Sequence, residues 1–317
     1  MSEETIRVGV SACLLGQKVR YDGGHKHSRY LTGVLSEHFE LVPVCPEAEV
    51  GMGTPRETVR LEGDVEAPRM VAPKSGADWT ARMNAYARRR LRDADMQDLD
   101  GFVFKKKSPS CGLFRLGVVQ DHGQAILTGR GLFAAVFTKA NPLVPVEEEG
   151  RLGDARLREN FLERIFAYHR VKRVFAGRWR RGSIVDFHSR EKYLLLSHSP
   201  RHYKELGRLV AAIAMHKPSE FKSKYVDLYM EALAVKATTR RHVNALMHIA
   251  GHLRGHVAPM ERERVRAVID DFASGLVPLV VPMTLLKHYV ELNGIPYVSD
   301  QTYLSPHPKE LMLRNHV

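Results

Sequence analysis

The sequence of 317 residues contains only three cysteines and no long run of apolar residues. Three cysteines are too few for a disulfide scaffold, so we expect reduced thiols in a reducing compartment. The longest apolar stretch, from 277 to 286, is too short to cross a bilayer and contains two prolines. The first residues include acidic side chains and lack the pattern of a signal peptide. These absences predict a cytoplasmic protein without a membrane segment.

The first half of the chain has no net charge. Residues 1–150 contain 20 Lys and Arg against 20 Asp and Glu, whereas residues 151–317 contain 28 against 16. The net charge of +12 therefore lies entirely in the second half. Because the chain is also long enough to bury two cores, this difference predicts two domains, 1–155 and 156–317.

The first half alternates strand-like and helix-like segments, whereas the second half is helix-like. Short apolar runs bounded by turn residues predict strands at 7–10, 39–44, 101–104, 116–119 and 125–127. A helical pattern opens at Asp78 and runs through Leu91. Further along, the pattern predicts helices at 156–171, 193–215, 222–235, 242–254 and 262–272. We therefore expect an α/β domain with a mostly parallel sheet, followed by an all-helical domain.

Each of the three cysteines follows a predicted strand and lies in a loop rich in Gly, Pro or Ser. Because ligand sites of parallel sheets lie beyond the carboxyl ends of the strands, the three thiols are expected in one site. They could be inert buried thiols, a zinc site, or the ligands of an iron-sulfur cluster that leaves one iron without a protein ligand. No Cys-x-x-Cys pair supports zinc, and the spacings of 32 and 66 residues match no zinc motif. The number of ligands by itself does not decide among the three.

Three segments resemble the signature of the thiouracil desulfidase (TudS) family, in order and over roughly the first 150 residues. They are SACLLGQKVRYDGGHK, VPVCPEAEVGMGTPRE and KKKSPSCGL. The resemblance implies an oxygen-sensitive [4Fe-4S] cluster bound by Cys13, Cys45 and Cys111, whose fourth iron binds the sulfur of a thiolated pyrimidine. The second half resembles the uncharacterised helical YbgA-type domain, known as a fusion partner of the first. That likeness is carried by Phe187-His188, Lys192-Tyr193, His198-Ser-Pro and the segment 303–311.

What the first resemblance implies is an enzyme that cleaves a carbon-sulfur bond and converts 2- or 4-thiouracil to uracil. The open iron would act as a Lewis acid and sulfur acceptor while water attacks the ring carbon. Glu47, two residues after Cys45, is the expected general base, and Ser108 is expected to contact the substrate or transfer a proton. Substrate contacts are expected from four further polar side chains: Arg20, Asp22, Arg56 and Ser110. Each assignment has a structural alternative, since Glu47 could be a surface carboxylate and the others ordinary turn or loop residues.

Two other functions remain open from the same residues. The cluster could serve a sulfur carrier or a tRNA-modifying enzyme, with the open iron binding hydrosulfide for delivery. It could instead be the oxygen or redox sensor of a nucleic-acid-binding regulator. The basic helical half also raises the hypothesis of tRNA contact, although its basic residues are scattered and no recognised RNA-binding motif is present.

Overall fold

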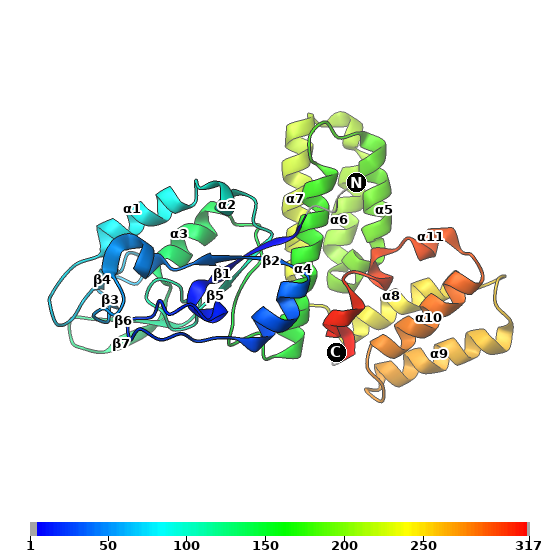
Figure 1. Cartoon of the computed structure of the whole chain (residues 1–317). Helices are drawn as coiled ribbons and strands as arrows, with labels where there is room; N and C mark the ends of the chain where they lie inside the picture. The colour runs from blue at the N-terminus through cyan, green and yellow to red at the C-terminus, as the bar shows by residue number, and fades with distance from the viewer. Residues whose placement is uncertain (1–4, 316–317) are drawn as a thin grey trace. The chain divides into compact units, whose positions relative to one another are not determined.

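The computed structural model describes residues 5–315, and the chain forms two compact units (Figure 1). The first unit ends at Gly153 and the second begins at Asp154. The boundary expected from the sequence lies two residues further on, between 155 and 156. Each unit has its own hydrophobic core.

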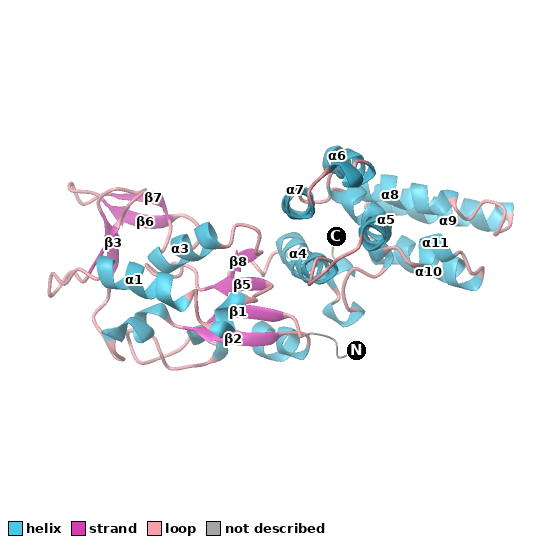
Figure 2. Cartoon of the chain, turned by 90° about the horizontal axis from the view of Figure 1, so that it is seen from above, coloured by secondary structure: helices cyan, strands magenta, loops and turns pink. Residues whose placement is uncertain are grey.

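The first unit is built on a parallel sheet with the strand order β2-β1-β5-β8 (Figure 2). β1 (Arg7–Ser11) pairs with β2 (Glu40–Val44) and with β5 (Gly101–Phe104), and β5 pairs with β8 (Val146–Glu148). The apolar run of β5 is buried along its whole length, as expected for a strand covered on both faces. Because the four strands run in one direction, their carboxyl ends meet at one edge.

A second sheet with the order β4-β3-β6-β7 is mixed. Its strands are β3 (Arg60–Glu62), β4 (Arg69–Val71), β6 (Leu116–Val119) and β7 (Ala125–Gly129). The central pair, β3 and β6, is parallel, and the two outer pairs are antiparallel. The predicted α/β fold with a mostly parallel sheet is confirmed. The sequence missed β3, β4 and β8 because a three-residue strand is too short to show a period.

An aromatic core fixes the first sheet against its helices, which are α1 (Thr80–Arg90), α2 (Ala94–Gln97) and α3 (Leu132–Ala140). The ring of Phe102 on β5 lies 4.0 Å from that of Phe104 and 4.9 Å from that of Phe137 on α3. Gly9 on β1 is required because a Cβ atom there would lie 2.3 Å from the Phe102 ring. This packing sets the positions of β1 and β5, and hence of the loops that follow them.

The second unit consists of helices, and residues 154–315 contain no strand. The helices are α4 (Ala155–Val174), α5 (Arg181–His198), α6 (Pro200–Ala211), α7 (Pro218–Ala234), α8 (Thr239–Gly251), α9 (Pro259–Ala273), α10 (Val280–Leu292) and α11 (Pro296–Ser299), followed by short 3-10 helices such as Thr302–Leu304 and Leu313–Asn315. Tyr193, Tyr225 and Tyr229 are fully buried in its core. The predicted all-helical second domain is confirmed.

One predicted helix is wrong in its bounds. The segment 193–215 was predicted as a single helix, but α5 begins earlier, at Arg181, and the chain leaves the helix at Ser199. Proline cannot continue a helix but fits the first turn of a new one, and Pro200 occupies that position in α6. The Ser199 hydroxyl caps α6 by accepting the backbone N–H of His202 at 3.4 Å.

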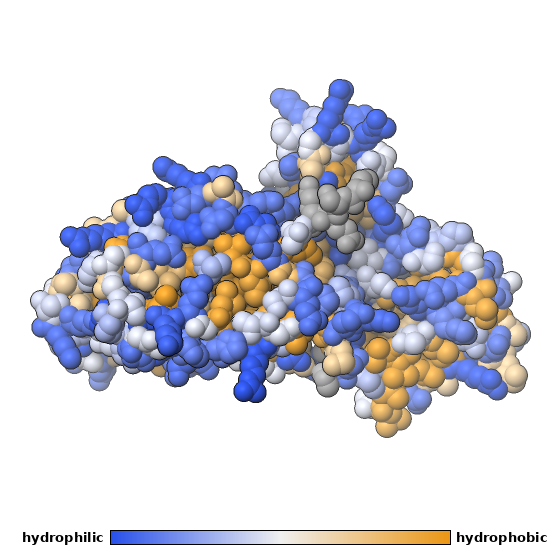
Figure 3. Space-filling model, viewed as in Figure 1, coloured by the Kyte–Doolittle hydropathy of each residue, from blue (hydrophilic) through white to orange (hydrophobic). Residues whose placement is uncertain are grey.

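Hydrophilic residues cover most of the face shown in Figure 3, and apolar residues appear over the sheet of the first unit and in the region of α9 and α10. α10 contains part of the longest apolar stretch of the sequence and buries Met283, Leu286 and Val290. Across residues 5–315, no helix is both long and apolar enough to cross a membrane.

Candidate functional site

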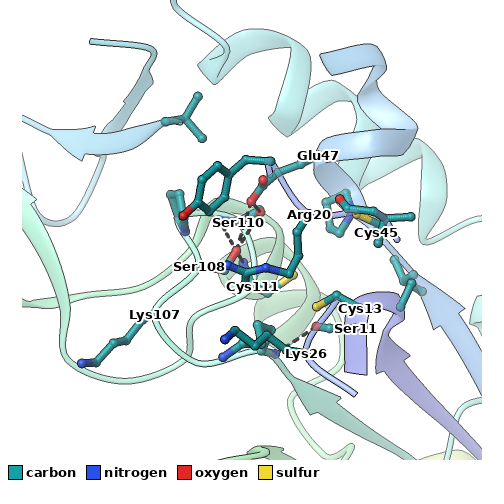
Figure 4. A pocket seen from close by; sticks show the side chains of 18 of the residues that line it. Ser11, Cys13, Arg20, Lys26, Cys45, Glu47, Lys107, Ser108, Ser110 and Cys111 are labelled. Atoms are coloured by element: carbon teal, nitrogen blue, oxygen red, sulfur yellow. Dashed lines mark hydrogen bonds between the residues drawn. The ribbon is translucent and has the colours of Figure 1, made fainter. Parts of the chain in front are cut away.

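The three cysteines line one cavity of about 340 Å³ in the first unit (Figure 4). Cys13 lies in a short 3-10 helix, Ala12–Leu15, directly after β1. Cys45 follows β2, and Cys111 belongs to the loop after β5. Because these strands are adjacent and parallel, thiols that are far apart in the sequence meet beyond one edge of the sheet.

Burial dominates the acid-base behaviour of the thiols. It raises the pKa of all three, to about 11 for Cys13, where the neighbouring Cys45 adds to the effect. The positive charges of Lys105 and Arg20 act in the opposite direction on Cys13. A thiolate in this cavity is therefore unfavourable by itself, and a bound metal group would stabilise it while releasing protons.

Glu47 is held at the wall of the cavity by four hydrogen bonds. Its Oε1 atom accepts from the Ser108 hydroxyl at 3.1 Å and from the Ser110 hydroxyl at 2.5 Å (Figure 4). Its Oε2 atom accepts from Nη2 of Arg56 at 2.6 Å and from Nε at 3.1 Å. The structure thus brings together four of the residues singled out in the sequence, and Glu47 is not an ordinary surface carboxylate, since 13% of its side chain is exposed.

Arg56 lines the cavity but directs most of its donors to the protein. Besides the two bonds to Glu47, its Nη1 atom donates to the carbonyl oxygens of Val19 at 2.9 Å and Gly53 at 3.0 Å. A guanidinium has five N–H groups, so these contacts leave little capacity for the substrate contact expected from the sequence. The geometry instead makes Arg56 a support of Glu47.

Arg20 and Asp22 belong to the same turn, but only Arg20 lines the cavity. Asp22 accepts the backbone N–H of Gly24 at 3.0 Å, which holds the pKa of its carboxyl group below the ordinary value, and Arg20 Nε lies 3.4 Å away. Asp22 therefore has the local turn-forming contact that the sequence offered as the alternative to substrate binding.

Two glutamates at the end of the first sheet hold the loop that carries Cys111. Glu148 on β8 accepts the backbone N–H groups of Leu113 at 2.8 Å and Phe114 at 3.3 Å. Glu149 accepts the backbone N–H of Lys106 at 2.7 Å, and its carboxylate also pairs with Lys105. The loop is therefore anchored on both sides of Cys111.

Glu49 supports the second cysteine in a similar way. Its Oε1 atom accepts the backbone N–H of Cys45 at 2.7 Å, and its Oε2 atom accepts the Tyr86 hydroxyl at 2.5 Å. Arg90 Nε lies 3.2 Å from the same carboxylate. These contacts tie the Cys45 loop to α1.

The donor set around the cavity suits a cluster better than a single ion. Within residues 5–315, no group of three or more His, Cys, Asp or Glu side chains is arranged to hold one metal ion. In an iron-sulfur cluster each thiolate binds a different iron atom, so the thiols do not have to converge on one point. Three thiols around a cavity with cationic Arg20, Lys26 and Lys105 at its wall match the chemistry of an anionic thiolate-bound cluster.

Comparison with known proteins assigns both halves of the chain. The family described as 2-thiouracil desulfurase matches residues 8–149, and a protein family of unknown function, DUF1722, matches residues 192–308. The uncharacterized protein YbbK of Bacillus subtilis (strain 168) is 31% identical over 145 residues, which cover 44% of this chain and 95% of that protein. The chain belongs to the 2-thiouracil desulfurase family.

A second relative matches a segment of similar length. The uncharacterized protein YbgA of Escherichia coli (strain K12) is 34% identical over 161 residues, covering 50% of this chain and 95% of that protein. Among solved structures, the [4Fe-4S]-dependent thiouracil desulfidase TudS is similar, with 32% identity over 48% of this chain and 97% of that one, at a TM-score of 0.40. The recognition of a TudS-type half fused to a YbgA-type half is confirmed.

The sequence did not reveal the carboxylates that support the cysteine loops. Glu148 and Glu149 belong to a run of three glutamates, a pattern more typical of a solvated linker than of a strand end. Glu49 lies four residues after Cys45, the separation at which one helical turn brings residues together, and this was the available signal. The partners of these glutamates lie up to 44 residues away, so the local periodicity of the sequence does not indicate the contacts.

Proposed function

We propose that the first unit removes sulfur from a thiolated pyrimidine, converting 2- or 4-thiouracil and water to uracil and hydrosulfide. The observation that carries the proposal is the meeting of Cys13, Cys45 and Cys111 at one cavity whose wall holds a fixed carboxylate, Glu47. The family description of residues 8–149 supports the same substrate class. The three thiols would hold a [4Fe-4S] cluster, and an oxygen-sensitive cluster agrees with the reducing cytoplasm expected from the sequence.

A cluster bound by three thiolates supplies one iron without a protein ligand, which is a Lewis acid and a sulfur acceptor. The chain itself supplies the base. Glu47 Oε1 takes a proton from water during attack on the ring carbon, either directly or through one of the two serine hydroxyls that it already accepts. Ser108 and Ser110 therefore relay or orient the proton, and Arg56 keeps the other carboxylate oxygen in place.

The cations around the cavity lower the energy of the negative charge that the reaction handles. Arg20, Lys26 and Lys105 line the cavity, and only 14% of the Lys105 side chain is exposed. In a partly desolvated site such charges interact more strongly than in water. They favour the thiolate ligands and the departing hydrosulfide, while Arg20 and Tyr21, which line the same cavity, would contact the pyrimidine.

The role of Glu47 is tested with Glu47→Gln, which preserves the shape of the side chain and removes the base. We expect iron content and visible absorbance like those of the wild type, with turnover reduced by about 100-fold or more. Glu66→Gln, an exposed glutamate of the same unit, is the matched control and should turn over normally. Retained turnover in Glu47→Gln would end the general-base assignment.

The cofactor is tested by iron and sulfide analysis after anaerobic reconstitution. About four irons and a broad absorbance near roughly 400 nm, both lost in Cys111→Ala, are expected of a three-thiolate cluster. No iron, or zinc in its place, would overturn the cofactor and with it the reaction.

The substrate is tested with free 2-thiouracil, free 4-thiouracil, a thiouridine nucleoside and thiolated tRNA in parallel. Uracil release from a free base supports the main proposal. Turnover of tRNA alone would support the tRNA contact predicted from the basic second half. Sulfur transfer into tRNA, or cluster-dependent nucleic-acid binding without turnover, would favour the sulfur-carrier or the redox-sensing alternative.

A further inference from the structure

One lysine at the cavity of the first unit is largely shielded from water. Lys105 directly follows β5, and its backbone N–H donates to the hydroxyl of Ser11 at 2.9 Å, two residues before Cys13. Its side chain lines the cavity and is 14% exposed, whereas Lys26 and Lys107 line the same cavity and are exposed. Figure 4 shows the Lys107 side chain pointing away from the three thiols. Of these three lysines, Lys105 therefore has the charge that water and salt screen least.

A glutamate holds the ammonium group of this lysine in place. Glu149, which follows β8, accepts from Lys105 Nζ at 2.5 Å and from the backbone N–H of Lys106 at 2.7 Å. Lys105 Nζ also donates to the carbonyl oxygen of Lys106 at 3.0 Å, and only 15% of the Glu149 side chain is exposed. The described residues that line the cavity include Lys105 but not Glu149. The positive end of the ion pair is therefore the end nearer the thiols.

The two charges of this pair act on the first cysteine in opposite directions. Burial raises the pKa of the Cys13 thiol to about 11, and the neighbouring Cys45 adds to the rise. Lys105 lowers that pKa and Glu149 raises it, and the effect of Lys105 is the larger. This order agrees with the geometry, since the ammonium group is at the cavity and the carboxylate is beyond it. Any anionic group that the thiols hold experiences the same two fields.

The reduction potential of an iron-sulfur cluster depends on its net charge, on hydrogen bonds to its sulfur atoms and on its exposure to solvent. Reduction adds one negative charge, so a fixed cation nearby favours it and a fixed anion opposes it. Conversion of thiouracil and water to uracil and hydrosulfide transfers no electrons. The substrate therefore does not set the oxidation state of the cluster, which is left to the surrounding charges and to the redox poise of the compartment.

We propose that the Lys105–Glu149 ion pair sets the reduction potential of the cluster, with Lys105 raising the potential and Glu149 lowering it. This inference rests on the proposed function, because it requires a cluster held by the three thiols. The carboxylate offsets part of the ammonium charge. A cation close enough to favour thiolate ligands is thus prevented from making the cluster easy to reduce.

The test is an anaerobic redox titration of the reconstituted full-length protein, followed by the visible absorbance of the cluster. Lys105→Met should lower the equilibrium constant for one-electron reduction by roughly tenfold or more, a potential lower by about 59 mV or more. Glu149→Gln should raise the same constant, and the double variant Lys105→Met/Glu149→Gln should lie between the two single variants. Opposite shifts identify an electrostatic role, because a loosened loop would change both single variants in the same direction.

Two controls separate the charge of the lysine from its place in the loop. Lys107→Met removes an exposed charge two residues further on and should keep the wild-type potential. Lys105→Arg retains the positive charge and should also remain near the wild-type potential. Iron content and Tm are measured for every variant. If Lys105→Met fails to hold iron, the double variant decides, since its potential should lie below that of Glu149→Gln.

The outcomes distinguish this proposal from the proposed function. A wild type that binds no cluster would overturn both the cofactor and the role of the ion pair. A wild type that holds the cluster and releases uracil, with Lys105→Met and Glu149→Gln at its potential or shifted in the same direction, would overturn only the role of the ion pair.

Discussion

Replacing Arg56 tests how the carboxylate of Glu47 is held. Arg56→Gln removes the charge and leaves at most one of the two donors that now reach Glu47 at 2.6 and 3.1 Å. It also removes the donors to the carbonyl groups of Val19 and Gly53. Only 5% of the Arg56 side chain is exposed, so water cannot readily replace these bonds.

The size of the effect follows from the burial of the pair. Removing one partner of a buried ion pair costs about 3–5 kcal/mol, and the partial exposure of Glu47 places the expected loss near the lower value, ~3 kcal/mol. Arg60→Gln is the matched control, because Arg60 Nε also lies 2.6 Å from a glutamate, Glu62, but 51% of its side chain is exposed. Exposed pairs contribute less than about 1 kcal/mol. For a unit of this size, each kcal/mol shifts Tm by roughly 2–4 °C.

Kinetics distinguish a support of Glu47 from a substrate contact. If Arg56 positions Glu47, kcat should fall by about tenfold or more in Arg56→Gln while KM stays near the wild-type value. If it binds the substrate, as the sequence suggested, KM should rise with kcat unchanged. Iron content is measured in parallel so that kcat is expressed per cluster. An Arg56→Gln protein with the Tm, kcat and KM of Arg60→Gln would refute the reasoning.

Glu49→Gln removes the charge of the carboxylate that accepts the backbone N–H of Cys45 at 2.7 Å. The reconstituted protein should therefore lose its visible absorbance faster in air. An unchanged rate of decay would contradict this role of Glu49. Gly131→Ala places a Cβ atom 2.5 Å from the carbonyl group of Ser110, so the ligand loop must shift and iron incorporation should fall. Gly33→Ala, where a Cβ atom meets no described atom within 4 Å, is its control. In the second unit, burial and the neighbouring Glu163 raise the pKa of Glu159 to about 8 from 4.5, so the protonated carboxyl stabilises the fold and this stabilisation is lost as pH rises toward 8. Between about pH 6 and 8, denaturant titration of the wild type should show a loss of up to roughly 1.4 kcal/mol per pH unit relative to Glu159→Gln, and parallel pH profiles would exclude the shift.

The sequence by itself determined the division into an α/β half and a helical half, and the place of the cysteines. The strands that carry the site, such as 101–104, are short apolar runs between turn residues, and this local pattern survives in the fold as β5. Since adjacent parallel strands end at one edge, the rule that ligands bind beyond that edge located the thiols without a structure. The separation of two residues from Cys45 placed Glu47 beside them in the same way.

Only the tertiary structure decided which side chains are partners. Glu47 meets Ser108 and Ser110, which lie 61 and 63 residues further along the chain. Arg56, expected from the sequence at the substrate, lies in an ion pair with Glu47. In the second unit, a cavity at Glu159 joins helices whose boundaries the sequence partly missed. The physical reason is that periodicity reports which face of an element is buried, whereas a single hydrogen bond between distant elements depends on how they pack and leaves no repeating pattern.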